Sequence, residues 1–210
     1  TVKHFVGDGG TNNGIDQGNT IIDELSLKEV HAKPYYAAIN ECALSIMASF
    51  NSWNGKKMHG NKYLLTEVLK SQMGFNGFIV GDWNGHGQIP GCEDNNCPDA
   101  LISGVDIYMV PSEWESLYLN TLEQVRNGVI PIERLNDAVQ RILIVKEHLG
   151  LFNQRVPHSY NKNFLGSKDH IALAREAVRE SIVLLKNHNN NLPMNPNKKY
   201  LIVGEMSQQI

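Results

Sequence analysis

Short apolar runs alternate with helical hydrophobic patterns through the first 150 residues of the chain. The runs are nearly continuous in their central parts, as expected for parallel strands that are covered on both faces. This alternation predicts an α/β fold in which helices lie outside a parallel sheet. Half of a (β/α)₈ TIM barrel and a doubly wound open sheet both fit, because periodicity does not distinguish a closed sheet from an open one. The candidate strands are Lys3–Val6, Ser45–Phe50, Gly77–Gly81 and Val105–Val110.

Helical patterns lie between and after these strands. Residues Pro34–Met47 contain a helical stretch that passes into the second strand. Asn61–Met73 has leucines at helical spacing, with Asn61 as its N-cap and Gly74 as its stop. The helices expected after the last strand are Trp114–Gly128 and Pro131–Gly150, the second with proline in its first turn.

The alternation is lost beyond residue 151. Residues Phe152–Gly166 are rich in Asn, Ser, Pro and Lys, which predicts a linker. Ser167 can cap the following helix, and a polar loop then leads to a predicted strand at Tyr200–Val203. We therefore expect a first unit at 1–151, a linker at 152–166 and a second, unfinished unit at 167–210. Because the chain opens in what reads as mid-strand, we expect an internal fragment of a longer protein.

The charge balance excludes some classes of partner. Lys and Arg number 19 and Asp and Glu number 22, a net charge of −3, so a polybasic nucleic-acid or membrane-surface protein is not expected. No apolar run approaches the roughly 18 residues that a transmembrane helix needs. The eight histidines form no HxH or HExxH pattern, so neither a metal nor another cofactor is predicted.

The three cysteines do not form a metal-binding pattern. Cys92 and Cys97 lie in the segment GCEDNNC, where both a small-loop disulfide and two free thiols fit, with the free thiols slightly favoured. A disulfide there would indicate an oxidising compartment. Cys42 lies in a predicted helix and is expected to be a small, buried apolar group.

Chemistry in a barrel gathers at the carboxyl ends of the strands. Asp82 follows an apolar strand directly and must face solvent or a ligand, unless it is the N-cap of the next helix. Taken alone, Lys3 and His4 can equally be a solvated lysine and a core histidine with no role in a site. The candidate site residues at these strand ends are Lys3, His4, Phe50, Asp82, Trp83 and Met109.

Five ordered segments of the chain resemble glycoside hydrolase family 3, in its β-glucosidase and exo-β-glucanase branch. They are KHFVGDGGTNNG, SIMASFNSWNGKKMHGN, GFIVGDWNG, GVDIYMVP and GVIPIERLNDAVQRIL, and AREAVRESIVLLKN resembles the opening of the family's second domain. The resemblance implies a (β/α)₈ barrel, of which residues 1–151 are the C-terminal half, followed by the start of an α/β sandwich at 167–210. It implies a retaining exo-β-glycosidase that acts on β-glucosides without a cofactor, in the periplasm or outside the cell.

The resemblance also implies roles for individual residues. The family's nucleophile is the Asp of an S-D-W motif, which reads Gly81-Asp82-Trp83 here, so one neighbouring hydroxyl is missing. Lys3 and His4 match the K-H pair that binds sugar hydroxyls, and Trp83 matches an aromatic that packs on sugar rings.

Other positions depart from the family's pattern. Phe50 stands where plant members carry Tyr, and Gln17 stands where those relatives have Glu. The loop GDGGTNNGIDQGNT has no histidine, which argues against the N-acetylglucosaminidase branch. The resemblance places the general acid in the second domain beyond this chain, so Glu180 and Glu205 are left unassigned and the fragment alone is expected to be inactive. A non-catalytic sugar-binding or structural paralogue is the alternative.

Overall fold

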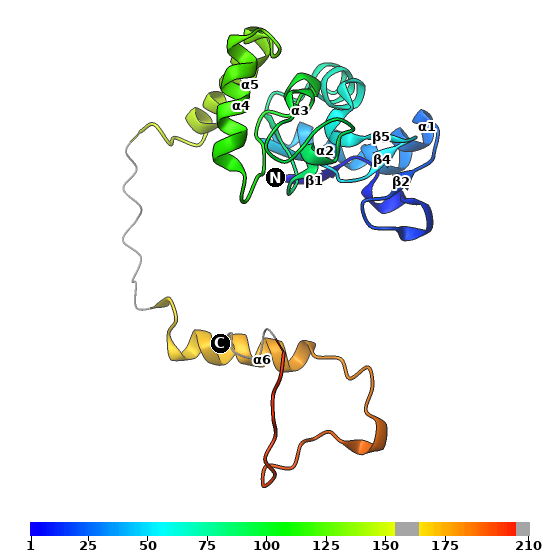
Figure 1. The fold of residues 1–210 in the computed structure, drawn as a ribbon, viewed down its shortest axis with the longest axis vertical. Coiled ribbons are helices and arrows are strands. Elements are labelled where there is room, and N and C mark those ends of the chain that lie inside the picture. Colours follow the sequence, from blue (N-terminus) through cyan, green and yellow to red (C-terminus); the bar gives the residue numbers. More distant parts are fainter. Residues whose placement is uncertain (154–163, 205–210) are drawn as a thin grey trace. The chain divides into compact units, whose positions relative to one another are not determined.

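The computed structural model describes residues 1–153 and 164–204. The chain divides into two compact units, Thr1–Arg155 and Val156–Ile210, and each is described by itself. Figure 1 shows the elements in chain order. The linker prediction at 152–166 lies mostly outside the described residues, and so does Glu205.

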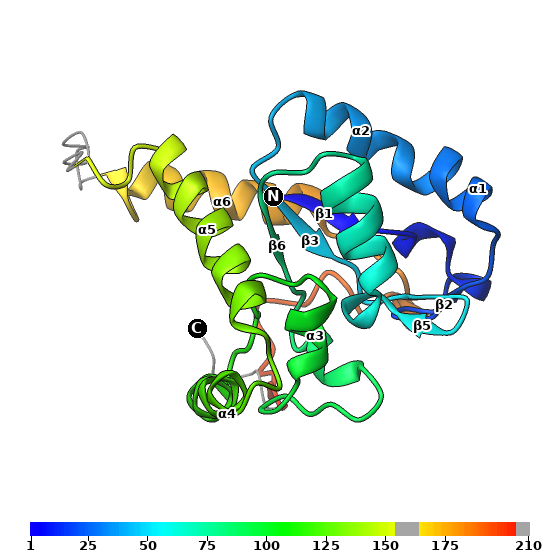
Figure 2. The same cartoon turned by 90° about the horizontal axis from the view of Figure 1, so that it is seen from above.

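A parallel three-stranded sheet forms the centre of the first unit (Figure 2). Its order is β1 (Val2–Phe5), β3 (Ser45–Ala48) and β6 (Phe78–Val80). β1 pairs with β3 and β3 pairs with β6, both in parallel. The three carboxyl ends therefore lie at one edge of the sheet, as the predicted strands required. The parallel α/β arrangement expected from the alternation is confirmed.

The fourth predicted strand, Val105–Val110, is much shorter than expected. It contributes a single parallel bridge, between Val80 and Ile107. The amide of Ile79 donates to the side-chain Oδ2 of Asp106 at 2.7 Å, so a carboxylate takes the place of a carbonyl in the ladder. Backbone bonds continue beside it, with Gly81 N donating to Ile107 O at 2.8 Å. The segment still runs along β6 although it does not form a regular strand.

The segments that follow β1 and β3 in the chain form a second, small sheet. β2 (Asn19–Thr20) pairs in parallel with β4 (Ser52–Trp53), which pairs in antiparallel fashion with β5 (Lys56–Lys57). It joins the loop that follows β1 to the loop that follows β3. The first loop follows the strand that carries Lys3 and His4, and the second contains Phe50, so this sheet holds the two segments together.

Helices follow the predicted positions with a few differences. The helix before β3 begins at Glu24, earlier than expected, and ends at Asn40. Asn61 Oδ1 accepts a hydrogen bond from Leu64 N at 3.2 Å, which confirms its predicted capping role, and Gly74 has a φ of +68°. The helical segments are α1 (Glu24–Ser26), η3 (Leu27–Ala32), α2 (Lys33–Asn40), η5 (Tyr63–Gln72), α3 (Pro98–Ser103), α4 (Trp114–Arg126), α5 (Ile132–His148) and α6 (Lys168–Ser181). The short 3₁₀ turns are η1 (Asp8–Gly10), η2 (Asn12–Gly14), η4 (Met58–Gly60), η6 (Gly85–Gln88) and η8 (His188–Asn190).

Two predictions about local structure are wrong. Cys42 is exposed and has a φ of +60°, because α2 has already ended and the residue lies in the turn toward β3. Tyr200–Val203 forms no strand among the described residues, and all four side chains are exposed. Ser167, by contrast, caps α6 as predicted, accepting from His170 N at 3.3 Å.

Side chains of the three strands form the core of the first unit. Phe5, Ile46 and Ile79 are fully buried, and the Phe5 ring meets the Tyr35 ring edge-on at 5.0 Å between centroids. Leucines of η5 pack on the same cluster. The core therefore sits between the sheet and the helices on its outside, which holds the strand ends in place.

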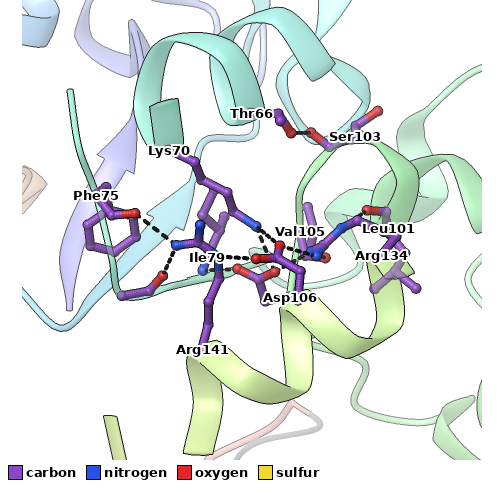
Figure 3. A network of polar contacts seen from close by, with 12 residues as sticks. Thr66, Lys70, Phe75, Ile79, Leu101, Ser103, Val105, Asp106, Arg134 and Arg141 are labelled. Atoms are coloured by element: carbon purple, nitrogen blue, oxygen red, sulfur yellow. Dashed lines mark hydrogen bonds and ion pairs between the residues drawn. The ribbon is translucent and has the colours of Figure 1, made fainter. Parts of the chain in front are cut away.

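A charged network ties α5 to the sheet (Figure 3). Asp106, whose side chain is fully buried, pairs with Lys70 Nζ at 2.7 Å and with Arg134. Arg141 donates to the carbonyl oxygens of Phe75 at 2.8 Å and Gly77 at 2.9 Å, just before β6. These contacts lie at the amino end of β6, away from the edge where the candidate site residues are found.

Candidate active site

Asp82 lies two residues beyond the end of β6, and its side chain is 15% exposed. Its Oδ1 accepts a hydrogen bond from Trp83 N at 2.8 Å, and its Oδ2 lies 3.4 Å from His4 Nε2. It does not cap the following turn, because η6 has Asn84 at its N-cap position with no side-chain capping bond. The alternative N-cap interpretation of Asp82 is therefore wrong, and the carboxylate faces the imidazole that follows Lys3.

His4 lies between two carboxylates. Its Nε2 faces Asp82, and its Nδ1 lies 3.2 Å from Asp8 Oδ2. An imidazolium can donate to both carboxylates, whereas a neutral ring carries only one N–H. His4 thus lies beside Asp82 with its side chain 28% exposed, and it is not a core histidine. Asp8 was not predicted, and only its place in the loop after the K-H pair could have pointed to it.

His59 contacts the backbone of Asp82 and was not predicted from the sequence either. Its Nε2 accepts from Asp82 N at 2.8 Å, and its side chain is buried. Burial, and after it the neighbouring His86 and Lys57, lower the pKa of His59 from 6.5 to about 3. The ring is therefore neutral at physiological pH, as an acceptor at Nε2 must be. A Cβ on Gly85 would overlap this ring, so the turn after Trp83 requires glycine there.

Trp83 stands on a tight turn, and its side chain is 60% exposed. Gly85 N donates to Asp82 O at 2.9 Å and closes the turn. Asn84, with a φ of +52°, donates from its backbone N to Met109 O at 2.9 Å. The structure thus brings Met109 to this turn through its carbonyl oxygen, and Trp83 stays largely exposed.

Phe50, Gln17 and Gln88 are joined by Lys57 and form one wall beside His59. Lys57 Nζ donates to Phe50 O and Gln17 O, both at 3.1 Å, and to Gln88 Oε1 at 2.8 Å. Burial lowers the pKa of Lys57. Gln88 Nε2 in turn donates to Gln17 Oε1 at 2.6 Å, so the side chain of Gln17 is engaged within the protein. The Phe50 ring lies 6.1 Å from the His59 ring, centroid to centroid, which places this wall beside the support of Asp82.

Lys3 is the predicted residue that the structure joins least closely to the others. Its side chain is exposed and makes no hydrogen bond or ion pair among residues 1–153 and 164–204. It lines a hollow of about 380 Å³ together with His4, Asp8 and His31. The K-H pair therefore shares one hollow, although only His4 contacts Asp82.

Cys92 and Cys97 form a disulfide, so the slightly favoured interpretation as free thiols is wrong. Their spacing alone does not show that the two sulfur atoms meet. Within the described part of the chain, no group of three or more His, Cys, Asp or Glu side chains is placed to hold a metal ion. None of the described helices has the length and apolar character needed to cross a membrane.

Residues 1–145 match the glycosyl hydrolase family 3 N terminal domain. The chain belongs to this family. The match contains both Asp82 and His4, and the order of elements from β1 to α5 falls within it or close to its end. The resemblance found in the sequence motifs is thereby confirmed.

Family 3 relatives extend well beyond this chain. A β-xylosidase from Formosa agariphila is 32% identical over 94% of the chain and 29% of its own length. A periplasmic β-glucosidase from Salmonella typhimurium is 32% identical over 99% of the chain and 28% of its own length. The crystal structure of an exo-1,3/1,4-β-glucanase from a Pseudoalteromonas species is 52% identical, with a TM-score of 0.75 over 91% of this chain and 25% of that one. The chain thus spans between a quarter and a third of these proteins.

Proposed function

We propose that this family 3 chain carries the nucleophile of a retaining exo-β-glycosidase, and that the nucleophile is Asp82. The observation that supports it best is the position of its carboxylate, at the carboxyl end of β6 and 15% exposed, with one oxygen bonded by Trp83 N and the other facing His4. The two contacts and the buried His59 acceptor fix the orientation of the carboxylate while leaving it accessible. A scaffold without catalytic function has no need of such an arrangement.

In the proposed first step, an oxygen of Asp82 attacks the anomeric carbon of the terminal sugar. A C–O bond forms to the carboxylate as the bond to the leaving oxygen breaks, and a general acid protonates that oxygen. Water then attacks the same carbon, the ester bond breaks, and the released sugar keeps its anomeric configuration. No residue of this chain is assigned as the general acid.

His4 and Lys3 are proposed to bind hydroxyl groups of the attacked sugar. The ring of His4 is held between Asp8 and Asp82, so its orientation is fixed before a sugar binds. Interactions of this kind accelerate the reaction when they strengthen as positive charge develops on the sugar ring. Trp83 is proposed to supply the apolar platform for the sugar unit that leaves, because its exposed indole stands next to the nucleophile.

The substrate class is proposed to be β-linked glucosides with a free non-reducing end. The relative with 52% identity is an exo-1,3/1,4-β-glucanase, and a periplasmic β-glucosidase is among the others. A xylose-containing substrate is the second candidate, because one relative is a β-xylosidase. A periplasmic or extracellular location is supported by the Cys92–Cys97 disulfide, because disulfides persist in oxidising compartments.

The parallel strands are proposed to be part of a (β/α)₈ barrel, with residues from 167 onward beginning an α/β sandwich. Three parallel strands and the Ile107 bridge in sequence order, with helices outside, are what consecutive barrel strands require. Lys57 and the small β2–β4–β5 sheet then join successive loops at the catalytic edge.

Trapping of the covalent intermediate tests the proposal. The test uses a hybrid enzyme in which this chain replaces the matching segment of the Pseudoalteromonas exo-1,3/1,4-β-glucanase. An activated 2-deoxy-2-fluoro-glucoside should label the hybrid on the peptide that contains Asp82, because fluorine slows release of the glycosyl-enzyme. A label on another residue, or inversion of the product, would contradict the assignment. Binding of glucosides without turnover would favour the non-catalytic alternative.

A further inference from the structure

The loop between β6 and α3 is closed into a ring by the Cys92–Cys97 disulfide. Inside the ring, Glu93 and Asn96 exchange two backbone hydrogen bonds of 3.0 Å. From outside, Gln124 Nε2 on α4 donates to Asn96 Oδ1 at 2.6 Å. The geometry of the ring is therefore set by a covalent bond, by its own backbone and by a neighbouring helix.

One side chain of this ring, Asp94, contacts the turn that carries the nucleophile. Its Oδ2 accepts from Asn84 Nδ2 at 2.8 Å, and its carbonyl oxygen lies 2.7 Å from Nε2 of the buried His86. A Cβ on Gly87 would overlap the Asp94 carboxylate. Asp94 thus contacts three of the four residues from Asn84 to Gly87.

These contacts determine the backbone next to Trp83. Asn84 has a φ of +52°, a region that non-glycine residues occupy at an energetic cost. Its side chain is bonded to Asp94, and its backbone N is bonded to Met109 O. Because Trp83 is 60% exposed, the orientation of its indole depends on this backbone more than on packing around the ring.

We propose that Asp94, held in the disulfide ring, is a positioning residue that orients Trp83 and thereby sets the affinity for the sugar unit that leaves. The inference rests on the proposed function, in which Trp83 faces that unit. Asp94 bonds to Asn84 and His86, and not to the carboxylate of Asp82. Its removal should therefore weaken binding of oligosaccharides and leave the chemistry on the attacked sugar largely intact.

The test compares two substrates in the hybrid enzyme. Laminaribiose, a β-1,3-linked diglucoside, places a sugar on Trp83, whereas β-glucosyl fluoride has no second sugar. Asp94→Ala should raise KM for laminaribiose about tenfold, with kcat changed less than about twofold, and should leave kcat/KM for the fluoride within about twofold. Asp94→Asn keeps an acceptor oxygen and should recover most of the loss. The double variant Cys92→Ser/Cys97→Ser should raise KM for laminaribiose in the same direction.

Glu93→Ala is the matched control, because it removes an exposed carboxylate from the same ring. It should behave like the unsubstituted hybrid. The inference is overturned if Asp94→Ala leaves laminaribiose kinetics unchanged, or if it lowers turnover of both substrates equally.

A second readout does not depend on turnover. With 5-fluorotryptophan incorporated and the signal assigned through Trp83→Phe, the ¹⁹F resonance of residue 83 should shift or broaden in Asp94→Ala and not in Glu93→Ala. If the unsubstituted hybrid fails to hydrolyse the fluoride, the proposed function falls, and this spectrum still decides the positioning. An unchanged resonance in Asp94→Ala overturns the positioning role.

Discussion

Two aspartates on neighbouring segments of the sheet have opposite surroundings. Asp106 is fully buried, and its two oxygens are occupied by Lys70, Arg134 and the amide of Ile79. Asp82 is 15% exposed, and its partners are one backbone N–H and one imidazole at 3.4 Å. A buried carboxylate whose two oxygens are both bonded by donors is a structural element, whereas one with an accessible oxygen and a fixed orientation can attack a substrate. The partners, and not the residue type, separate the two roles.

Substitution of Asp82 should have the largest effect of the changes considered for the two aspartates and their neighbours, and the effect should be on turnover. Asp82→Asn in the hybrid should lower kcat for an aryl β-glucoside by about 10⁴-fold or more, because the covalent step loses its nucleophile. Thermal unfolding should change little. Azide should restore part of the turnover in Asp82→Ala by entering the vacated space. Near-normal activity would remove Asp82 from the role, and Glu115→Gln, on the exposed start of α4, is the control.

The neutral His59 behind Asp82 should appear in the pH dependence of stability. Its pKa is about 3 in the folded chain against 6.5 ordinarily, so the unfolded state binds more protons between these values. Its contribution is complete above pH 6.5 and is lost as pH falls toward 3, up to ~5 kcal/mol. His59→Gln should remove this dependence. The slope of the hybrid's unfolding free energy against pH should fall by ~1.4 kcal/mol per pH unit between about pH 4 and 6. An equal slope in both proteins would show that His59 is protonated in the folded state.

Asp106→Asn tests the structural role of the other aspartate and should lower the stability of the fold. The amide removes the buried counter-charge of Lys70 and Arg134, which then pair only with the half-exposed Asp137. Removing one partner of a buried pair costs up to about 3–5 kcal/mol. Hydrogen exchange at the amide of Gly81, which donates to Ile107 O, should report the loss. Asp99→Asn, an exposed position at the start of α3, should leave that amide protected. Retained protection in Asp106→Asn would mean that the network is not a determinant of stability.

Asp8 should give the smallest effect of the four. Asp8→Ala removes the carboxylate that faces His4 Nδ1, so the ring loses one of its two orienting partners. We expect kcat/KM of the hybrid for an aryl β-glucoside to fall about tenfold, which is ~1.4 kcal/mol. Asp8→Asn, which keeps an acceptor, should lose less. Equal kinetics for Asp8→Ala and the exposed-site control Glu29→Gln would leave His4 oriented by Asp82 alone.

Local signals in the sequence predicted the elements well where the residues themselves set the backbone. Asn61 and Ser167 cap helices as expected, and the apolar runs from β1 to β6 became parallel strands. The position of Asp82 at a strand end followed from the same pattern. The helix from Glu24 was found only in part, because Asp23, which accepts from Ser26 N at 2.9 Å, was not recognised as its N-cap.

Contacts between distant residues were beyond the reach of that reasoning. His59 is 23 residues from Asp82, and nothing in its own segment indicates that it accepts a hydrogen bond from the Asp82 amide. The side chain of Asp106 replaces a carbonyl in the ladder, which shortened a strand that its composition predicted to be regular. Cys42 lies outside its predicted helix, since α2 ends at Asn40. The sequence did not reveal this end because the positive φ falls on Cys42 itself and not on a glycine.

The packing of His59 on Gly85 limits the mutational routes open to this turn. Any side chain at position 85 meets the imidazole, so a single substitution there must displace the acceptor of the Asp82 amide. Position 85 is therefore free to change only after position 59 has become smaller. That intermediate has already lost the acceptor of the Asp82 amide, so the two residues form an evolutionary unit in which the order of changes matters.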